Sequence, residues 1–437
     1  MFSATIQRYR AAYAGLPRDV WLLALVLLIN RSGTMVVAFM TLYLTSQLEM
    51  SEAAAGRMIG VFGLGCVSGA YLGGRLSERV GAIRLQTVCM FLAAPGYWVV
   101  GWWETWPPIA VSLFFVAMAA ECVRTANATA IATLSTAENR MRAFALNRLA
   151  ANLGFSIGPV VGGVLAEIDF GLLFIVDAAT TFAAALALLA FFRMRRDHVV
   201  ATSEAPPVRV SPLADRAFVA LLVLFLVHLV VFFQFSTTYP LYLRDHFQLE
   251  KWQIGLMFAV NTTVIVLVEM VLLDAIKHWP LVRTIGWGCF LSCLGFGMLP
   301  FGASIAYAVL AMLVVTVGEM LSFSLSAGFV ASRSPRGCEG LYMGWYTMTF
   351  ALASVLGPAV GSAIYGVDRE ALWYGAIVVG AGVLAGFLAL ATRVEAEVGD
   401  LPETAAAALV PETTDRRAAP TAPLEAAVLA NAVAAES

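Results

Sequence analysis

The sequence predicts an all-α integral membrane protein whose twelve transmembrane helices form two pseudo-symmetric six-helix bundles. Hydrophobic residues make up 60% of the 437 residues and charged residues only 13%, whereas a soluble chain carries about 25% charged residues. Twelve apolar stretches are long enough to cross a bilayer, and features of the first six recur in the second six at a fixed offset. Together these observations favour a duplicated membrane protein.

Each apolar stretch has the length of roughly 20 residues that a spanning helix needs. The first stretch is too long for a cleavable signal peptide, and the polar Asn30 and Arg31 interrupt it, so we expect it to remain as a spanning helix. The stretches cover residues 19–45, 54–77, 83–103, 108–134, 142–166, 170–192, 216–240, 253–275, 281–301, 305–330, 340–366 and 370–392.

Short sequence features recur 199 residues further along the chain. Leu42-Tyr43-Leu44 returns as Leu241-Tyr242-Leu243, and Gly158-Pro159 returns as Gly357-Pro358. A repeat at a constant offset indicates two halves with the same order of helices. Transporters built from such repeats often bind substrate where the halves meet, near the middle of the bilayer.

The Lys and Arg side chains predict the orientation in the membrane. If both termini are cytoplasmic, 21 of the 27 basic residues lie in cytoplasmic segments, with Arg148 counted among them. Only Arg244, Lys251 and Arg369 lie outside, and Arg31, Arg57 and Arg124 lie in or at the edge of helices. This asymmetry agrees with the positive-inside rule. We therefore expect a multi-pass protein of the cell membrane, inner or plasma, with both termini in the cytoplasm.

The chain divides into four parts at its changes of composition. We expect an N-terminal half at 1–193, a cytoplasmic linker at 194–214, a C-terminal half at 215–393 and a disordered cytoplasmic tail at 394–437. The linker is polar and proline-rich, and the tail consists largely of Ala, Glu, Pro and Thr. The sequence has no glycine-rich phosphate loop, so an ion gradient rather than ATP would drive any pumping.

The turn between the second and third stretches carries a recognisable pattern. Residues 74–84, Gly-Arg-Leu-Ser-Glu-Arg-Val-Gly-Ala-Ile-Arg, resemble the signature of the major facilitator superfamily, with Glu78 in place of the usual Asp and no basic pair after Gly81. The resemblance extends over about 19–393. In that family the signature is a cytoplasmic gate whose acid lies near the start of helix 11, a contact that the positive end of a helix favours. The resemblance thus implies a gate formed by Gly74, Glu78, Arg79, Gly81 and Arg84; the alternative is a basic turn that only sets topology.

The fifth stretch carries a second pattern, at Asn152–Gly163. It is similar to the helix 5 motif of exporters in this superfamily, which favours the proton-driven branch that exports drugs and small molecules. Small residues four apart allow two helices to approach closely, and proline can bend a helix. We interpret the motif and its repeat as packing and hinge residues, namely Gly154, Gly158, Pro159, Gly162, Gly357, Pro358 and Gly361.

Ionisable residues within the stretches are costly, at about 2.5–3.5 kcal/mol or more near a helix centre, and are often functional. Arg31 lies about 18 Å into its helix at 1.5 Å per residue. Arg124 follows Glu121 by three positions and so shares its helix face. We predict a central charged network of Arg31, Glu121 and Arg124 between helices 1 and 4. It acts either in transport or as a static pairing that holds the N-terminal half together.

Glu319 is the strongest candidate for proton coupling. It lies 14 residues into the tenth stretch, which contains no Lys or Arg at spanning depth, so its partner must come from elsewhere or it must be protonated. The segment around it is similar to helix 10 of some proton-driven multidrug exporters. Glu269 in the eighth stretch is the second candidate acid, the alternative being an interfacial residue. A buried carboxyl that binds and releases a proton is what proton coupling requires.

Weaker candidates remain within the helices. Asn30, His228 and Gln234 are candidates to line a cavity, although a lone histidine in a helix is more often a packing residue. Asp177, early in the sixth stretch, is expected to reach the outer interface.

The sequence therefore predicts a proton-coupled exporter of small amphipathic molecules. It shows no catalytic pattern, so we expect no enzyme, no cofactor and no metal site. The expected partners are a small-molecule substrate, protons and lipid, without nucleic acid, for a protein that functions as a monomer. The alternatives are a proton-coupled importer, a dedicated exporter of one metabolite, and a membrane sensor that keeps the fold but does not transport.

Overall fold

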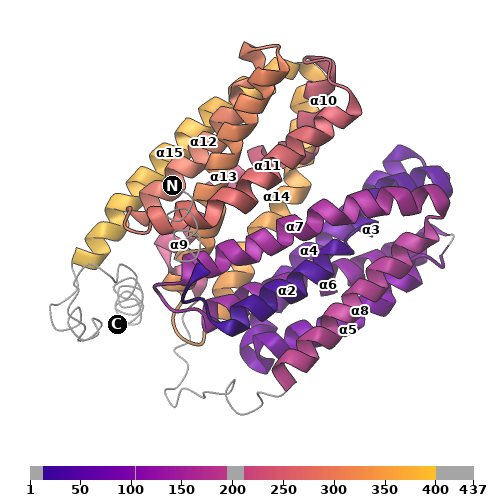
Figure 1. The fold of residues 1–437 in the computed structure, drawn as a ribbon, viewed down its shortest axis with the longest axis horizontal. Coiled ribbons are helices and arrows are strands. Elements are labelled where there is room, and N and C mark those ends of the chain that lie inside the picture. The colour runs from indigo at the N-terminus through magenta and orange to yellow at the C-terminus, as the bar shows by residue number, and fades with distance from the viewer. Residues whose placement is uncertain (1–12, 104, 194–210, 400–437) are drawn as a thin grey trace, which may run out of the picture.

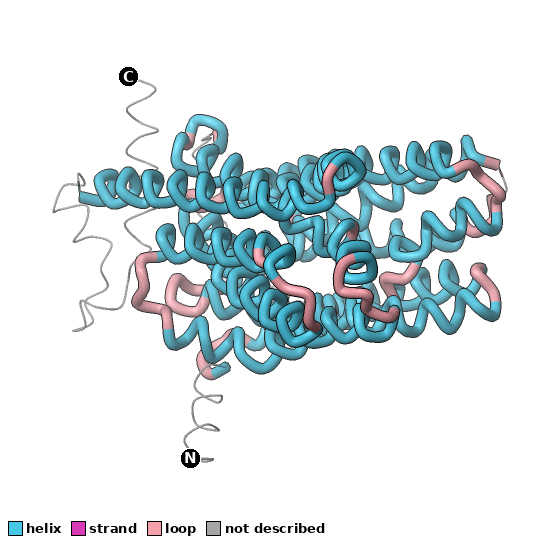
Figure 2. Tube along the Cα trace, turned by 90° about the horizontal axis from the view of Figure 1, so that it is seen from above, coloured by secondary structure: helices cyan, strands magenta, loops and turns pink. Residues whose placement is uncertain are grey.

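The computed structural model describes residues 13–103, 105–193 and 211–399, and within these ranges the chain is helical and has no β-strand. Helices joined by short loops make up nearly all of it (Figure 2). The helices of the N-terminal half are α2 (Arg18–Ser32), α3 (Val36–Leu42), the π-helix η1 (Tyr43–Gln47), α4 (Glu52–Val80), α5 (Ala82–Val100), α6 (Trp106–Leu134), α7 (Arg140–Ile168) and α8 (Gly171–Arg193). The C-terminal half has α9 (Arg216–Phe232), α10 (Thr238–Asp245), α11 (Lys251–Ala275), α12 (Leu281–Gly297), α13 (Ile305–Arg333), α14 (Glu339–Val367) and α15 (Arg369–Gly399), with 3-10 turns η2 (Pro212–Ala214), η3 (Phe233–Ser236) and η4 (Leu299–Phe301).

The predicted fold class is confirmed. Ten helices of the described chain are long and apolar enough to cross a membrane. The first predicted stretch is divided between α2 and α3, and the ninth, α12, is shorter at 17 residues. Helix α15 continues to Gly399, so residues 394–399, which were expected to belong to a disordered tail, are helical. The rest of that tail, 400–437, and the linker residues 194–210 lie outside the described residues.

The first spanning segment is broken at its middle, between α2 and α3. The carboxylate of Asp177 in α8 caps the start of α3, because its Oδ2 accepts hydrogen bonds from the backbone N–H groups of Met35 at 3.3 Å and Val36 at 3.1 Å. The N–H group of Val36 would otherwise be unpaired at a helix start, whereas that of Met35 also donates to the carbonyl oxygen of Gly33 at 2.7 Å. The expectation that Asp177 reaches the outer interface is wrong: it is 1% exposed, because it supplies acceptors to a buried break.

The seventh segment is broken at the corresponding place, since adding 199 to Val36 gives Phe235, within the turn η3 between α9 and α10. Here the amide of Gln234 bridges the break. Its Nε2 donates to the carbonyl oxygens of Val230 at 2.9 Å and Gly357 at 2.7 Å, and its Oε1 accepts from Thr238 Oγ1 at 2.9 Å. A carboxylate and an amide thus occupy equivalent structural roles in the two halves.

Glycines of the repeated motif lie directly against the two breaks. A Cβ atom added to Gly158 of α7 would lie 3.0 Å from the carbonyl oxygen of Thr34, and one added to Gly357 of α14 would lie 2.7 Å from Cβ of Phe233. Only glycine allows this approach without displacing a neighbour. The breaks and the motif therefore form one packed unit in each half.

The two halves are joined at the linker end, which we define as the helix ends that carry Gly81, Arg193 and Arg216. One buried apolar cluster includes residues of both halves, whereas two further clusters each belong to one half. At the linker end α4 and α14 cross so closely that a Cβ on Gly74 would lie 2.6 Å from the carbonyl oxygen of Gly340. The halves lie together near α9 and diverge towards α3 and α10 (Figure 1).

Candidate functional site

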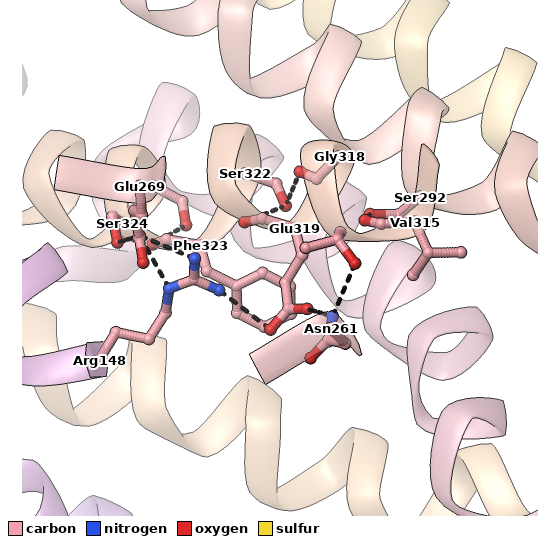
Figure 3. A network of polar contacts seen from close by, with 12 residues as sticks. Arg148, Asn261, Glu269, Ser292, Val315, Gly318, Glu319, Ser322, Phe323 and Ser324 are labelled. Carbon is pink, nitrogen blue, oxygen red and sulfur yellow. Dashed lines mark hydrogen bonds and ion pairs between the residues drawn. The ribbon is translucent and has the colours of Figure 1, made fainter. Parts of the chain in front are cut away.

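An ion-pair network joins the two halves through Arg148 of α7. Its guanidinium reaches Glu269 of α11, with Nε at 2.9 Å and Nη2 at 2.7 Å from Oε1, and its Nη1 lies 3.0 Å from Oε1 of Glu319 in α13. Figure 3 shows the guanidinium between the two carboxylates. One cation of the N-terminal half is therefore shared by two acids of the C-terminal half.

Neutral side chains complete the surroundings of both acids (Figure 3). Ser324 donates to Glu269 Oε1 at 2.6 Å, and Asn261 Nδ2 donates to Glu319 Oε2 at 2.9 Å. The two glutamates are 1% and 8% exposed. Among the described residues, Oε2 of Glu269 has no hydrogen-bond donor. A proton can therefore add to that oxygen without displacing an existing bond.

The formal charge of this network depends on protonation. With both glutamates ionised and Arg148 positive, the network carries one negative charge, and one bound proton makes it neutral. An uncompensated charge in a buried site is costly. The arrangement can thus bind and release a proton while the attraction between the halves changes.

The sequence identified both acids but not the arginine between them. Arg148 was counted among the cytoplasmic basic residues, and this is wrong, because it lies within α7 and its charge is paired inside the bundle. Arg148 lies inside the predicted apolar stretch 142–166, and this position could have marked it as a buried charge, as the position of Arg31 did. Its contact with α11 and α13 was not readable from spacing, because these helices are far apart in sequence.

A second polar cluster lies in the N-terminal half, on α6. Arg124 Nε donates to Glu121 Oε1 at 2.8 Å and Oε2 at 3.0 Å, and its Nη2 bonds the same carboxylate. The guanidinium also donates to the carbonyl oxygen of Thr347 in α14 at 2.8 Å. The pairing expected from the i, i+3 spacing is present, and it extends to the other half.

Arg31 of α2 lies by the same cluster but is not paired with it. Arg31, Glu121 and Arg124 all line a cavity of about 260 Å³. Within the described residues Arg31 makes no ion pair, although the charges of Glu121 and Arg124 act on it. The structure thus brings the three predicted residues around one cavity and places an ion pair between only two of them.

The three cavity candidates have different surroundings. Asn30 lines the 260 Å³ cavity and donates to Thr181 Oγ1 at 3.1 Å. His228 and Gln234 do not line it. His228 is fully buried with its ring among Phe225, Phe232 and Phe323, which is the packing role that a lone helical histidine usually has. Gln234 bridges the helix break described above.

The predicted gate residues lie at the linker end. Glu78 Oε1 accepts a hydrogen bond from the backbone N–H of Leu341 at 2.8 Å, in the first turn of α14. Gly81 has a φ of +87° and separates α4 from α5, while Arg79 and Arg84 are exposed. The acid therefore meets a helix start, where partial positive charge favours it. Its neighbours Arg79 and Arg84 make no ion pair within the described part of the chain.

Two further contacts at the linker end were not foreseen. Arg333, at the end of α13, is fully buried and pairs with Asp215 before α9, with Nε 2.6 Å from Oδ2 and Nη2 2.8 Å from Oδ1. Arg140 of α7 donates to the carbonyl oxygen of Ala331 in the other half at 3.1 Å. The sequence places both arginines among the 21 basic residues of the predicted cytoplasmic segments and gives no indication of these partners.

Comparison with known proteins gives a consistent family match. The sequence model described as "Major Facilitator Superfamily" matches residues 20–358. The chain is 23% identical over 362 residues to "Uncharacterized MFS-type transporter YttB" of Bacillus subtilis (strain 168), covering 80% of this chain and 90% of that protein. It is 24% identical over 342 residues to "Multidrug resistance protein 1" of the same organism, covering 76% and 86%. A crystal structure of a bacterial homologue of the iron transporter ferroportin, in an outward-facing state, has a TM-score of 0.70 at 14% identity, covering 86% of this chain and 100% of that one.

Proposed function

Since this chain belongs to the major facilitator superfamily and is a multi-pass membrane transporter rather than an enzyme, we propose that it is a proton-coupled exporter of small amphipathic molecules. A relative named as a multidrug resistance protein supports export, and the helix 5 glycine motif points the same way. The observation that carries the proposal is Arg148, shared between Glu269 and Glu319 across the two halves.

The coupling mechanism follows from the charge of this network. A proton from outside adds to the Glu269–Glu319 pair and weakens the hold of these acids on Arg148, because a neutral carboxyl no longer attracts the guanidinium as an ion. The halves then rearrange and the site opens to the cytoplasm. Release of the proton restores the ion pairs and returns the site, now with substrate, to the outside. Each cycle moves a proton inward and a substrate outward.

The described conformation fits the outward-facing stage of this cycle. We assign the linker end to the cytoplasm, with both termini, from the distribution of Lys and Arg, and we place the protein in the plasma membrane as a functional monomer. At that end Gly74 and Gly340 bring α4 and α14 together, and Glu78 holds the start of α14. These residues form the proposed cytoplasmic gate, together with Arg79, Gly81 and Arg84.

The breaks in the first and seventh segments are the proposed hinges. Each break is held by one buried polar side chain, Asp177 or Gln234, and packs against glycines of the repeated motif. Interrupted helices of this kind recur around the sites of transporters built from repeats. Small φ and ψ changes at these breaks would let each outer segment move without unfolding.

The alternatives are an importer driven by protons, a dedicated exporter of one metabolite, and a sensor that does not transport. Everted membrane vesicles with an acidic lumen and a lumenal pH-sensitive dye distinguish them. In this test a panel of small amphipathic acids and amines is added outside. An exporter alkalinises the lumen when a substrate enters it, whereas a symporter moves protons and substrate in the same direction. Absence of proton movement with every compound would contradict proton-coupled export.

The decisive variants are Glu319→Gln and Glu269→Gln, with Glu167→Gln as the matched control. Glu167 lies in the same helix as Arg148 but is exposed. Substrate-induced proton movement should disappear in the first two variants and persist in the control. Transport of many compounds of the panel would indicate a multidrug exporter, whereas transport of a single compound would indicate a dedicated exporter.

A further inference from the structure

We propose that the 260 Å³ cavity around Arg31 binds the acidic group of an amphipathic organic anion, so that the exported substrates are small aromatic or aliphatic carboxylates. This inference rests on the proposed transport function and names its substrate class. The cavity is lined by residues of α2, α3, α4, α5, α6, α7 and α8 in the N-terminal half, and by residues of η3 and α14 in the C-terminal half. It therefore lies where the two halves meet.

The charges around this cavity leave Arg31 available to a ligand. Glu121 is bound by Arg124 through both of its carboxylate oxygens. Asp177 uses Oδ2 to cap the break in the first segment. Both acids that line the cavity thus have established partners. The guanidinium of Arg31 forms no hydrogen bond or ion pair with the residues that the structure describes, and its planar fork suits a carboxylate.

The second arginine presents a further hydrogen-bond donor to the cavity, while its charge is balanced by that of Glu121. In the Arg124–Glu121 pair the arginine side chain is 27% exposed and the glutamate 11%, so the guanidinium is the more accessible member. Nη1 of Arg124 donates to none of the described residues, whereas its Nε and Nη2 are occupied. A ligand in the cavity would meet two guanidinium groups. The guanidinium of Arg31, unpaired among the described residues, with the Nη1 donors of Arg124 beside it, favours an anionic ligand over an amine.

The remaining walls fit an apolar body attached to the acidic group. Phe62 and Phe155 come from the N-terminal half, and Phe233 and Phe350 from the C-terminal half. The guanidinium of Arg124 lies 5.2 Å from the ring centre of Phe350, so the polar and aromatic parts of the cavity adjoin. A cavity of about 260 Å³ lies just below the range of roughly 300–1,000 Å³ that is typical of ligand pockets. A compact carboxylate therefore fits better than a lipid.

Binding to the purified wild-type protein tests this inference without any gradient. Benzoate and naphthoate are each compared by isothermal titration calorimetry with the amide and the aminomethyl compound that carry the same ring, and inorganic phosphate is added as a fourth probe. We expect each acid to bind at least about tenfold more tightly than its amide, a difference of about 1.4 kcal/mol, and the amines to bind most weakly. Phosphate should bind more weakly than either acid because it lacks an apolar body.

Variants locate the contact. Arg31→Gln should weaken naphthoate binding by about tenfold to a hundredfold, or about 1.4–2.8 kcal/mol, and Arg31→Lys should recover part of that loss. Arg57→Gln is the matched control, because Arg57 is an exposed helical arginine outside the cavity lining. Size-exclusion profiles check that each variant is folded. The comparison of ligands on the wild-type protein tests the inference even if a variant fails to fold.

Three results would overturn the inference: amines or amides that bind as tightly as the acids, no binding of either acid, or unchanged affinity in folded Arg31→Gln. Failure of the proposed function has a different signature. If the acids bind as expected but no compound moves protons in vesicles, the anion site is supported and proton-coupled export is contradicted. If protons move with amines alone, transport stands and the anion site falls.

Discussion

Replacing Arg148 by glutamine removes the guanidinium that Glu269 and Glu319 share. The two acids then remain in a site where they are 1% and 8% exposed, with the hydroxyl of Ser324 and the amide of Asn261 as their described donors. Replacing Glu319 by glutamine is a milder change, because the Arg148–Glu269 pair stays intact and the network becomes neutral. The two variants should therefore differ strongly in stability although both alter one residue of the same network.

The magnitude can be worked from the distances. Opposite unit charges 3.0 Å apart attract each other by about 5–6 kcal/mol at an effective dielectric constant of about 20, before desolvation is considered. Desolvation offsets much of that attraction, and the measured cost of removing one partner of a buried pair is about 3–5 kcal/mol. Loss of one hydrogen bond to a charged group costs about 1.5–3 kcal/mol. We therefore expect Arg148→Gln to cost about 2 kcal/mol more than Glu319→Gln.

Thermal unfolding of the purified proteins in detergent, followed by size-exclusion chromatography, measures this order of stability. Arg57→Gln serves as the control for loss of a helical arginine. Combining Arg148→Gln with Glu269→Gln and Glu319→Gln should recover much of the loss, because no buried charge remains unpaired. Equal stability of Arg148→Gln and the wild type, or no recovery in the triple variant, would refute the reasoning.

Three further outcomes follow from the other contacts. Glu78→Gln should open the linker end and slow transport, because it removes a charge–helix interaction worth about 0.3–1 kcal/mol. Distances between spin labels across the linker end measure this opening, and unchanged distances would contradict the proposed gate. Arg124→Ala should destabilise the protein by about 3–5 kcal/mol and so impair folding or transport, because it leaves Glu121 unpaired. Adding Glu121→Gln to the same protein should recover part of this loss. Full insertion and full transport by both single variants would show that the pair is not needed for either. Gly158→Ala should lower the expression of folded protein, because the new Cβ would lie 3.0 Å from a carbonyl oxygen. Gly163→Ala should be tolerated, because the nearest atom to its new Cβ would be 3.8 Å away. Equal expression of the two variants would argue against close packing at the break.

Much of the architecture was readable from the sequence, because apolar length and repetition are properties of the chain itself. The offset of 199 related Gly158-Pro159 to Gly357-Pro358, and in the structure Gly158 and Gly357 both lie against helix breaks. The depth of Glu319 and Glu269 within apolar stretches was also sufficient to single them out. An acidic side chain at the depth of a membrane-spanning helix is energetically costly whichever residue it pairs with, so its position in the sequence alone marks it as a candidate functional residue.

Contacts between distant helices were not readable in the same way. The partner of Glu319 is Arg148, 171 positions away, and no spacing rule connects α7 with α13. The break at Gly33–Met35 was missed because the stretch 19–45 is apolar on both sides of it, although Ser32, Gly33 and Thr34 form a small and polar run that is typical of interruptions. Once the break was missed, the buried role of Asp177 could not be predicted.

Proton coupling through the Glu269–Glu319 pair is tested most directly by measuring two modes of transport by Glu319→Gln in proteoliposomes. Transport driven by a pH gradient requires the acid to bind and release a proton, whereas exchange of labelled for unlabelled substrate without a gradient does not. The account predicts loss of gradient-driven transport with exchange largely retained, and both modes intact in the exposed control Glu167→Gln. Gradient-driven transport at the wild-type rate in Glu319→Gln would contradict it.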